Sequence, residues 1–254
     1  MHKYAIDAKQ LGDESALPWT NLGLWQYTTV YTAACQNLAQ HLAQSLNLQA
    51  HDVLLDLGCG QGASLALWQN VYQLHHIEAV ELQPHCVEKI KKQNLPALKN
   101  IYCHSFLALQ NFKFKQNFDV MMCIDALYHH NISEFLSSVQ NHLNINGRLG
   151  FHYLVLSDAW EKTSFLKQQQ YRYLLKCADI NINNLMTQSN LKELIKNQGY
   201  KHVITENLTE DVFKGFSDFV AQHSIQNFKI KMTAKLCHKL YLENLIYYVQ
   251  VIAH

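Results

Sequence analysis

Apolar residues follow two alternating patterns along this chain, and the alternation predicts its architecture. Between residues 27 and 48 they recur at Val30, Ala34, Leu38, Leu42 and Leu46, which places one apolar stripe on a long helix. The next stretch, "HDVLLDLG", is a continuous apolar run that ends in glycine. Such a run is typical of a strand that is buried on both faces.

The rest of the chain repeats this alternation of strands and helices. We expect Asn131 to cap a helix over residues 132–143, with Glu134 completing a capping box, and Gly199 to end a helix over 190–197. Repeated strand–helix–strand units imply an α/β, doubly wound, mostly parallel sheet with helices on both faces. The other predicted helices cover residues 62–72 and start at Pro84, and the other strands cover 77–81, 101–104, 118–124, the run "GRLGFHYLVL", 202–205 and 245–252.

One segment interrupts the alternation. Residues 157–186 combine aromatic and amphipathic helical material, including Trp160, Phe165 and Tyr171, between two predicted strands. An insertion of this size at strand ends is more often a lid or substrate wall than a linker. We therefore divide the chain into an N-terminal helical cap (1–50) and a main domain (51–254) that contains a lid insertion (157–186).

Composition narrows the range of partners. The chain has 254 residues, only 16% of them charged, and a formal net charge of +1. An average domain is about 25% charged, and this softer surface suits a monomer or a homodimer. The basic runs are short and scattered, so we expect no nucleic-acid partner, which would require a concentrated basic face.

Cysteine spacing and the apolar runs indicate the compartment. Seven cysteines occur without a CxxC motif, which is typical of reduced, buried thiols. The first fifteen residues contain no apolar signal-peptide core, and no apolar run approaches the roughly 20 residues that cross a bilayer. We expect a cytoplasmic, soluble protein without a membrane partner.

A glycine-rich loop, "VLLDLGCGQGAS", follows the first predicted strand and has two interpretations. Gly58, Gly60 and Gly62 would let the backbone turn sharply and approach a ligand at a helix N-terminus. Gly58, Gly60 and Ala63 also satisfy a dinucleotide-binding pattern. Asp56, just before the loop, suits an ammonium group better than a pyrophosphate. Glu81, which ends the next strand, suits ribose hydroxyls in either case.

Five stretches in order carry a resemblance to a known family. "VLLDLGCGQG", "IEAVEL", "FDVMMCIDALYHH", "NGRLGF" and "LKELIKNQGYKHV" resemble the class I S-adenosylmethionine-dependent methyltransferases. "NLGLW" before the long helix is similar to the N-terminal cap of bacterial small-molecule members, including enzymes acting on sugars and natural products. The resemblance implies a seven-stranded sheet whose last strand is antiparallel. It also implies S-adenosyl-L-methionine as cofactor, bound over the strand carboxyl ends.

The resemblance assigns cofactor contacts residue by residue. The family usually has an acid after the third strand, and here the stretch "CHSFLAL" places Ser105 there, with Phe106 expected to pack on the adenine ring. The packing residue Cys59, with Gln61 and Cys123, completes the expected set. The other implied contacts are Asp56, Gly58, Gly60 and Gly62 for the methionine part, Glu81 for the ribose, Leu82 beside the adenine, and Trp25 as a possible cap that could equally be a core aromatic.

Two adjacent histidines follow the fourth predicted strand in "CIDALYHHN". His129 matches the position where similar small-molecule methyltransferases often carry a histidine, and an imidazole changes charge near neutral pH, as a general base must. The sequence supports a catalytic role and a packing role of His129 equally. We interpret His130, just before the helix cap, as structural. Adjacent residues rarely bind one ion, and no spaced partner set appears, so we expect no metal site.

The leading functional hypothesis is methyl transfer to a small, partly hydrophobic acceptor, most readily a hydroxyl oxygen. The displacement would be in line (SN2), with His129 as a candidate general base. The stretch "IDAL" lacks the [DN]PP[YF] motif of amino-group methylation, and no Pro-Cys dipeptide supports pyrimidine methylation. Two alternatives remain: an NAD(P)-dependent oxidoreductase that uses the same glycines, and a methyltransferase-like scaffold without turnover. Asp119 is expected to tie a strand start to neighbouring backbone.

Overall fold

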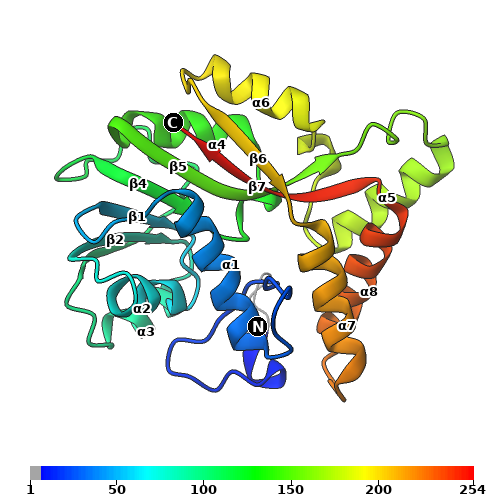
Figure 1. The fold of residues 1–254 in the computed structure, drawn as a ribbon, viewed down its shortest axis with the longest axis horizontal. Helices are drawn as coiled ribbons and strands as arrows, with labels where there is room; N and C mark the ends of the chain where they lie inside the picture. Colours follow the sequence, from blue (N-terminus) through cyan, green and yellow to red (C-terminus); the bar gives the residue numbers. More distant parts are fainter. Residues whose placement is uncertain (1–6) are drawn as a thin grey trace.

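Seven strands form one sheet in the order β3-β2-β1-β4-β5-β7-β6 in the computed structural model, which describes residues 7–254 (Figure 1). β7 runs antiparallel to both β5 and β6, and the other neighbouring pairs are parallel. The predicted doubly wound sheet with an antiparallel last strand is confirmed. The strands are β1 Val53–Leu57, β2 His76–Glu81, β3 Leu98–Cys103, β4 Phe118–Cys123, β5 Leu143–Leu156, β6 Val203–Asn207 and β7 Ile246–Ala253.

The helices begin and end close to the predicted bounds. The Asn131 side chain accepts hydrogen bonds from the Ser133 and Glu134 N–H groups, which confirms the expected cap of α4. Gly199 has φ +98°, as expected after α6. The α-helices are α1 Tyr31–Ser45, α2 Ala63–Asn70, α3 Pro84–Lys91, α4 Ile132–Val139, α5 Phe165–Cys177, α6 Gln188–Asn197, α7 Gly215–Gln222 and α8 Phe228–Glu243.

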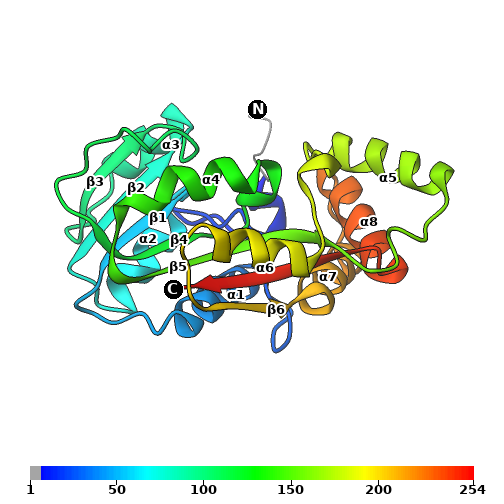
Figure 2. The same cartoon turned by 90° about the horizontal axis from the view of Figure 1, so that it is seen from above.

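Helices cover both faces of the sheet. Figure 2 shows α4 and α6 on one side of the central strands and α1 on the other. α1 packs so closely on β5 that a Cβ added at Gly150 would lie 2.9 Å from Leu42 Cδ1. Part of the predicted N-terminal cap is therefore a layer of the α/β fold. The first six residues of that cap lie outside the described residues, and so does that part of the predicted absence of a signal peptide. The division of the chain at residue 50 stays a prediction.

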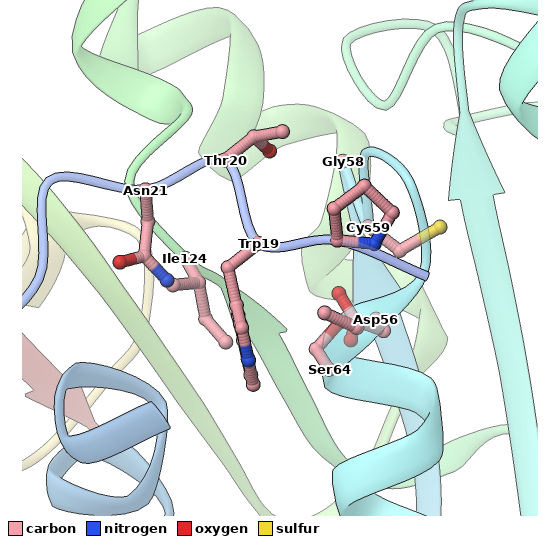
Figure 3. A pocket seen from close by; sticks show the side chains of 10 residues that line it. Trp19, Thr20, Asn21, Asp56, Gly58, Cys59, Ser64 and Ile124 are labelled. Carbon is pink, nitrogen blue, oxygen red and sulfur yellow. The ribbon is translucent and has the colours of Figure 1, made fainter. Parts of the chain in front are cut away.

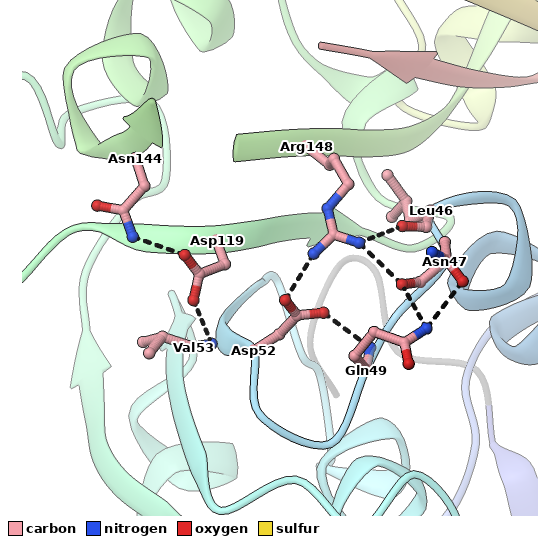
Figure 4. A network of polar contacts seen from close by, with 8 residues as sticks. All are labelled: Leu46, Asn47, Gln49, Asp52, Val53, Asp119, Asn144 and Arg148. Carbon is pink, nitrogen blue, oxygen red and sulfur yellow. Dashed lines mark hydrogen bonds and ion pairs between the residues drawn. The ribbon is translucent and has the colours of Figure 1, made fainter. Parts of the chain in front are cut away.

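A polar network joins the strand starts at the amino edge of the sheet (Figure 4). Asp119 accepts hydrogen bonds from the Val53 N–H at 2.9 Å and from the Asn144 side-chain amide at 2.7 Å. Arg148 donates to Asp52 at 2.6 Å and to the Leu46 carbonyl at 2.7 Å. These charges lie at the edge opposite the strand carboxyl ends. The structural interpretation of Asp119 is confirmed.

Two helical insertions extend beyond the sheet on its carboxyl side. The predicted insertion at 157–186 contains α5, and a π-helical turn (Glu210–Lys214) leads into α7 and α8 between β6 and β7. α5 and α8 lie side by side (Figures 1 and 2). Glu243 at the end of α8 accepts a hydrogen bond from the hydroxyl of Tyr171 on α5 at 2.7 Å and forms an ion pair with Lys167 of α5 at 3.1 Å. From the sequence we assigned no helix between the predicted strands at 202–205 and 245–252.

Within residues 7–254, all seven cysteines are free thiols, five of them buried. No helix in this range is long and apolar enough to span a membrane. The same range contains no group of three or more His, Cys, Asp or Glu residues placed to hold a metal ion.

Candidate active site

Glu81 fixes the glycine loop at the carboxyl end of β2. One carboxylate oxygen accepts a hydrogen bond from the Gly60 N–H at 2.9 Å, and the other accepts from the Gln83 N–H at 2.8 Å. The Gly58 N–H donates to the Val80 carbonyl at 2.8 Å, which ties the loop to the same strand. Burial raises the pKa of Glu81. The loop and a buried carboxylate therefore form one rigid wall.

Asp56 lies at the floor of a small cavity beneath the N-terminal segment (Figure 3). Its Oδ2 accepts a hydrogen bond from the Trp68 indole at 2.7 Å, and burial raises its pKa to about 6. The cavity volume is about 30 Å³, enough for a water or a small polar group. Its walls are Pro18, Trp19, Thr20 and Asn21 from the N-terminal segment with Gly58, Cys59, Ala63, Ser64 and Ile124.

A second cavity, of about 590 Å³, opens at the carboxyl ends of the strands. This volume lies within the usual range for small-molecule sites. It is lined from one side by the glycine loop and the ends of β2 and β4, and from the other by α5, α7 and α8. The predicted site residues that it brings together are Gly58, Gly60, Gln61, Glu81, Leu82, Ser105, Phe106 and His129.

Phe106 forms the wall between the glycine loop and the histidine pair. Its ring would lie 3.2 Å from a Cβ added at Gly58, and it meets the His130 ring edge-on at a centroid distance of 5.2 Å. Ser105, in the place of the family's acid, accepts a hydrogen bond from the Leu107 N–H at 3.2 Å. Phe106 therefore occupies the space above Gly58 that only a residue without a side chain leaves open.

The two histidines have different surroundings. His129 Nδ1 is 3.2 Å from the Asp179 carbonyl oxygen. A carbonyl oxygen only accepts, so Nδ1 carries the hydrogen and Nε2 is the basic nitrogen of the neutral ring. Burial lowers the pKa of His130, and its carbonyl accepts a hydrogen bond from the Tyr153 hydroxyl at 3.2 Å. Both rings line the cavity, so His130 is part of the wall as well as of the framework.

Asp125 is a wall residue that the sequence analysis did not single out. It has φ +52°, and its carboxylate accepts from the Tyr248 hydroxyl at 2.8 Å and from the Leu22 N–H at 2.7 Å. Burial raises its pKa to about 6. The sequence feature that could have pointed to this residue is a carboxylate directly after the fourth strand. Its partners, 103 and 123 positions away along the chain, were not visible.

Three predicted cofactor contacts do not line either cavity. Trp25 is buried, stacks on Phe219 at 4.6 Å and donates its indole hydrogen to the Leu22 carbonyl at 2.8 Å. It therefore lies in the core, as the alternative interpretation had it, because a tightly packed Gly215 leaves room for its ring. Cys123 is fully buried, and Gly62 faces Ile90, where an added Cβ would lie 2.7 Å from Cγ1.

Comparisons with known proteins agree with this geometry. A family model described as a methyltransferase domain matches residues 28–205. No curated protein matches the sequence.

Solved structures share the fold at low sequence identity. The cyclopropane synthase MmaA2 from Mycobacterium tuberculosis is similar with a TM-score of 0.75 and 15% identity, covering 100% of this chain and 96% of that one. Geranyl diphosphate C-methyltransferase from Streptomyces coelicolor A3(2), solved with Mg²⁺, geranyl-S-thiolodiphosphate and S-adenosyl-L-homocysteine, gives 0.72 and 14%, covering 97% and 91%. The [4+2]-cyclase SpnF gives 0.68 and 16%, covering 97% and 89%. The shared fold accommodates different reactions, so the chemistry of this site has to come from its own residues.

Proposed function

Because the chain belongs to the methyltransferase domain family, we propose that it transfers a methyl group from S-adenosyl-L-methionine to a small, partly hydrophobic acceptor. The observation that carries this proposal is the pairing of a rigid glycine loop, anchored by Glu81, with an apolar cavity at the strand carboxyl ends. Neighbouring structures with S-adenosyl-L-homocysteine or sinefungin bound support the choice of cofactor.

The residues present fit this cofactor. The small cavity beside Asp56 suits the ammonium group of the methionine part, and Thr20 and Ser64 add polar atoms at its walls. Glu81 lines the large cavity, where a carboxylate would accept hydrogen bonds from ribose hydroxyls. Leu82 and Phe106 offer apolar surface for the adenine ring. The bound cofactor would supply a methyl group that its sulfonium charge already activates for displacement.

The acceptor side of the cavity is mainly apolar, so positioning is the chief contribution of the chain. Holding two reactants in line can equal an effective concentration of about 10⁵–10⁸ M. Leu236 and Leu240 of α8 line this cavity together with Leu174 and Ile180. These walls exclude water and favour an acceptor with an apolar body.

His129 suits the removal of a proton from an acceptor hydroxyl. Its ring lines the cavity, and the hydrogen bond from Nδ1–H to the Asp179 carbonyl orients Nε2 as the basic nitrogen. The proton would move from the acceptor oxygen to Nε2 as the methyl group is transferred. We propose a hydroxyl oxygen as the acceptor atom on this ground.

Calorimetry with S-adenosyl-L-methionine and S-adenosyl-L-homocysteine tests the cofactor assignment. We expect binding of both, and the absence of binding at millimolar concentration would end the proposal. A nicotinamide cofactor that co-purifies with the protein would instead support the oxidoreductase alternative.

An acceptor panel tests the reaction. Matched pairs of apolar molecules, one with a hydroxyl and one with an alkene at the same position, are incubated with the cofactor while S-adenosyl-L-homocysteine release is measured. We expect turnover of the hydroxyl member. Turnover of the alkene member alone would show methylation at carbon instead of oxygen, the type of reaction named for the structurally similar geranyl diphosphate C-methyltransferase. Cofactor binding without any turnover would favour the scaffold alternative.

A further inference from the structure

Basic side chains are concentrated on the two helices that flank the large cavity. α5 and α8 together carry seven lysine and arginine residues and one acidic residue, Glu243. The whole chain has 21 Lys and Arg against 20 Asp and Glu. The remainder therefore carries fourteen basic and nineteen acidic residues. The nearly neutral total conceals a cationic pair of helices on an anionic body.

The same two helices expose apolar side chains. Leu166 and Tyr173 on α5 are 81% and 69% exposed, and Phe228 and Met232 on α8 are 76% and 43% exposed. Spacings of seven and four residues place each pair on one helix face. Tyr173 and Met232 also line the cavity. The exposed apolar surface is therefore continuous with the cavity wall.

Lysines accompany these apolar residues on α8. Lys235, three positions after Met232, is exposed and lines the cavity, and Lys239, four positions further on, lines it as well. Lys239 already pairs with Glu243 in this structure. We call the exposed set on these two helices the rim; it consists of Leu166, Tyr173, Phe228, Lys231, Met232 and Lys235.

We propose that the rim docks on an anionic lipid bilayer surface. Helices that lie in the membrane interface combine exposed Phe and Leu side chains with lysines, so that the apolar groups enter the headgroup boundary and the cations meet the lipid phosphates. The anionic remainder of the chain would be repelled by the same surface, which orients the cavity opening toward the bilayer. A soluble acidic partner would pair with the lysines but gives no reason for the exposed apolar residues.

Docking on a surface differs from crossing a membrane. The expectation that this chain has no membrane partner rested on its lack of a spanning segment, and surface docking needs none. The proposal rests on the proposed function only in that the cavity is taken to receive an apolar acceptor. The docking itself requires neither cofactor nor turnover.

Vesicle flotation of the full-length protein tests the docking. Vesicles of phosphatidylcholine alone are compared with vesicles in which one third of the lipid is phosphatidylglycerol, at low and at high salt. We expect binding to the anionic vesicles only, weakened by salt. The Lys231→Glu/Lys235→Glu variant should lose roughly fivefold in vesicle affinity for each lysine that is removed. The glutamates that replace them should lower the affinity further, because they are repelled by the anionic lipid. Phe228→Ser/Met232→Ser should lose about tenfold or more.

Matched controls come from exposed positions elsewhere on the chain. Tyr27→Ser/Ile145→Ser changes two side chains that are 86% and 95% exposed, and Lys113→Glu/Lys115→Glu makes the same change in net charge as the rim variant. Both should bind vesicles like the unchanged protein.

Absence of binding to anionic vesicles, or equal losses in rim and control variants, would overturn the proposal. The proposal would also fail if the protein bound soluble heparin more strongly than vesicles and if the Phe228/Met232 change left the heparin binding unaffected. Such a result would indicate a soluble acidic partner. Cofactor calorimetry is independent of all these outcomes, so failure of the docking and failure of the proposed function are distinguishable.

Discussion

The cavity has two sides that are built differently. On the glycine-loop side, the contacts join neighbouring parts of the chain: Gly60 and Glu81 are 21 positions apart, and Glu81 and Gln83 only two. On the acceptor side, His129 meets Asp179 fifty positions away, and Asp125 meets Tyr248 across 123. The first side is therefore specified by a local motif, whereas the second exists only once distant segments have packed together. We expect changes on the first side to alter cofactor binding or stability, and changes on the second to alter turnover or the pH dependence of stability.

His129→Ala is the change with the largest expected effect, and it lies on the acceptor side. General base catalysis typically contributes 10²–10⁴-fold, so kcat with a hydroxyl acceptor should fall by about that factor while cofactor affinity stays the same. Steady-state kinetics and calorimetry measure the two quantities separately. His130→Ala is the matched neighbour, and an equal fall in its kcat would show that the pair only shapes the cavity.

On the glycine-loop side, Gly62→Ala is the change with the largest expected loss of protein stability. The residue has φ +92°, and the new Cβ would lie 2.7 Å from Ile90 Cγ1. Left-handed strain and overpacking together predict a loss of about 2–4 kcal/mol in the free energy of unfolding. Gly199→Ala is the control, because its φ is +98° but no atom lies within 4 Å. Urea unfolding should show a loss of only about 1 kcal/mol there, and similar losses at both positions would refute the packing argument.

Glu81→Ala should weaken cofactor binding by about 10- to 100-fold, since hydrogen bonds to a charged group contribute about 1.5–3 kcal/mol. The change also removes the acceptor of the Gly60 N–H at 2.9 Å. Calorimetry with S-adenosyl-L-homocysteine measures the loss. Glu88→Ala, an exposed position on α3, serves as the control. Unchanged affinity in Glu81→Ala would remove the ribose assignment.

Asp125→Asn should alter the pH dependence of stability by a smaller amount. Burial raises the pKa of Asp125 from 3.8 to about 6, so the folded protein holds this proton more tightly than the unfolded chain. The stabilisation is present at low pH and is lost as the pH rises through about 6. Between pH 4 and pH 7 the unchanged protein should lose about 2 kcal/mol more than the variant. Denaturant unfolding at the two pH values measures the difference, and identical slopes would contradict the buried state of this carboxyl.

Several elements follow from the sequence because their causes are local. Asn131 caps α4 by accepting from the N–H groups two and three positions further on, and Gly199 adopts a left-handed conformation that side chains resist. The glycine loop and Glu81 belong to one strand–loop–helix–strand unit, and short sequence motifs identify such units.

Trp25 shows the limit of this reasoning. Its position beside a motif-like segment allowed both a cofactor-capping role and a core role, and the sequence left them equal. The structure places the ring against Gly215 and Phe219, nearly two hundred residues later in the chain. No local pattern encodes that contact.

By itself, the sequence determined the alternating strands and helices, the mostly parallel sheet, and the glycine loop with its carboxylate. Short-range hydrogen bonding and the periodicity of apolar residues are sufficient for these. Only the tertiary structure decided that Asp125 lies between Leu22 and Tyr248, that His129 presents Nε2 as its basic nitrogen, and that α5 and α8 line one cavity with Lys235 and Lys239 of α8 in its wall. These features depend on which side chains face each other across large sequence separations, and that is fixed by packing of the whole chain.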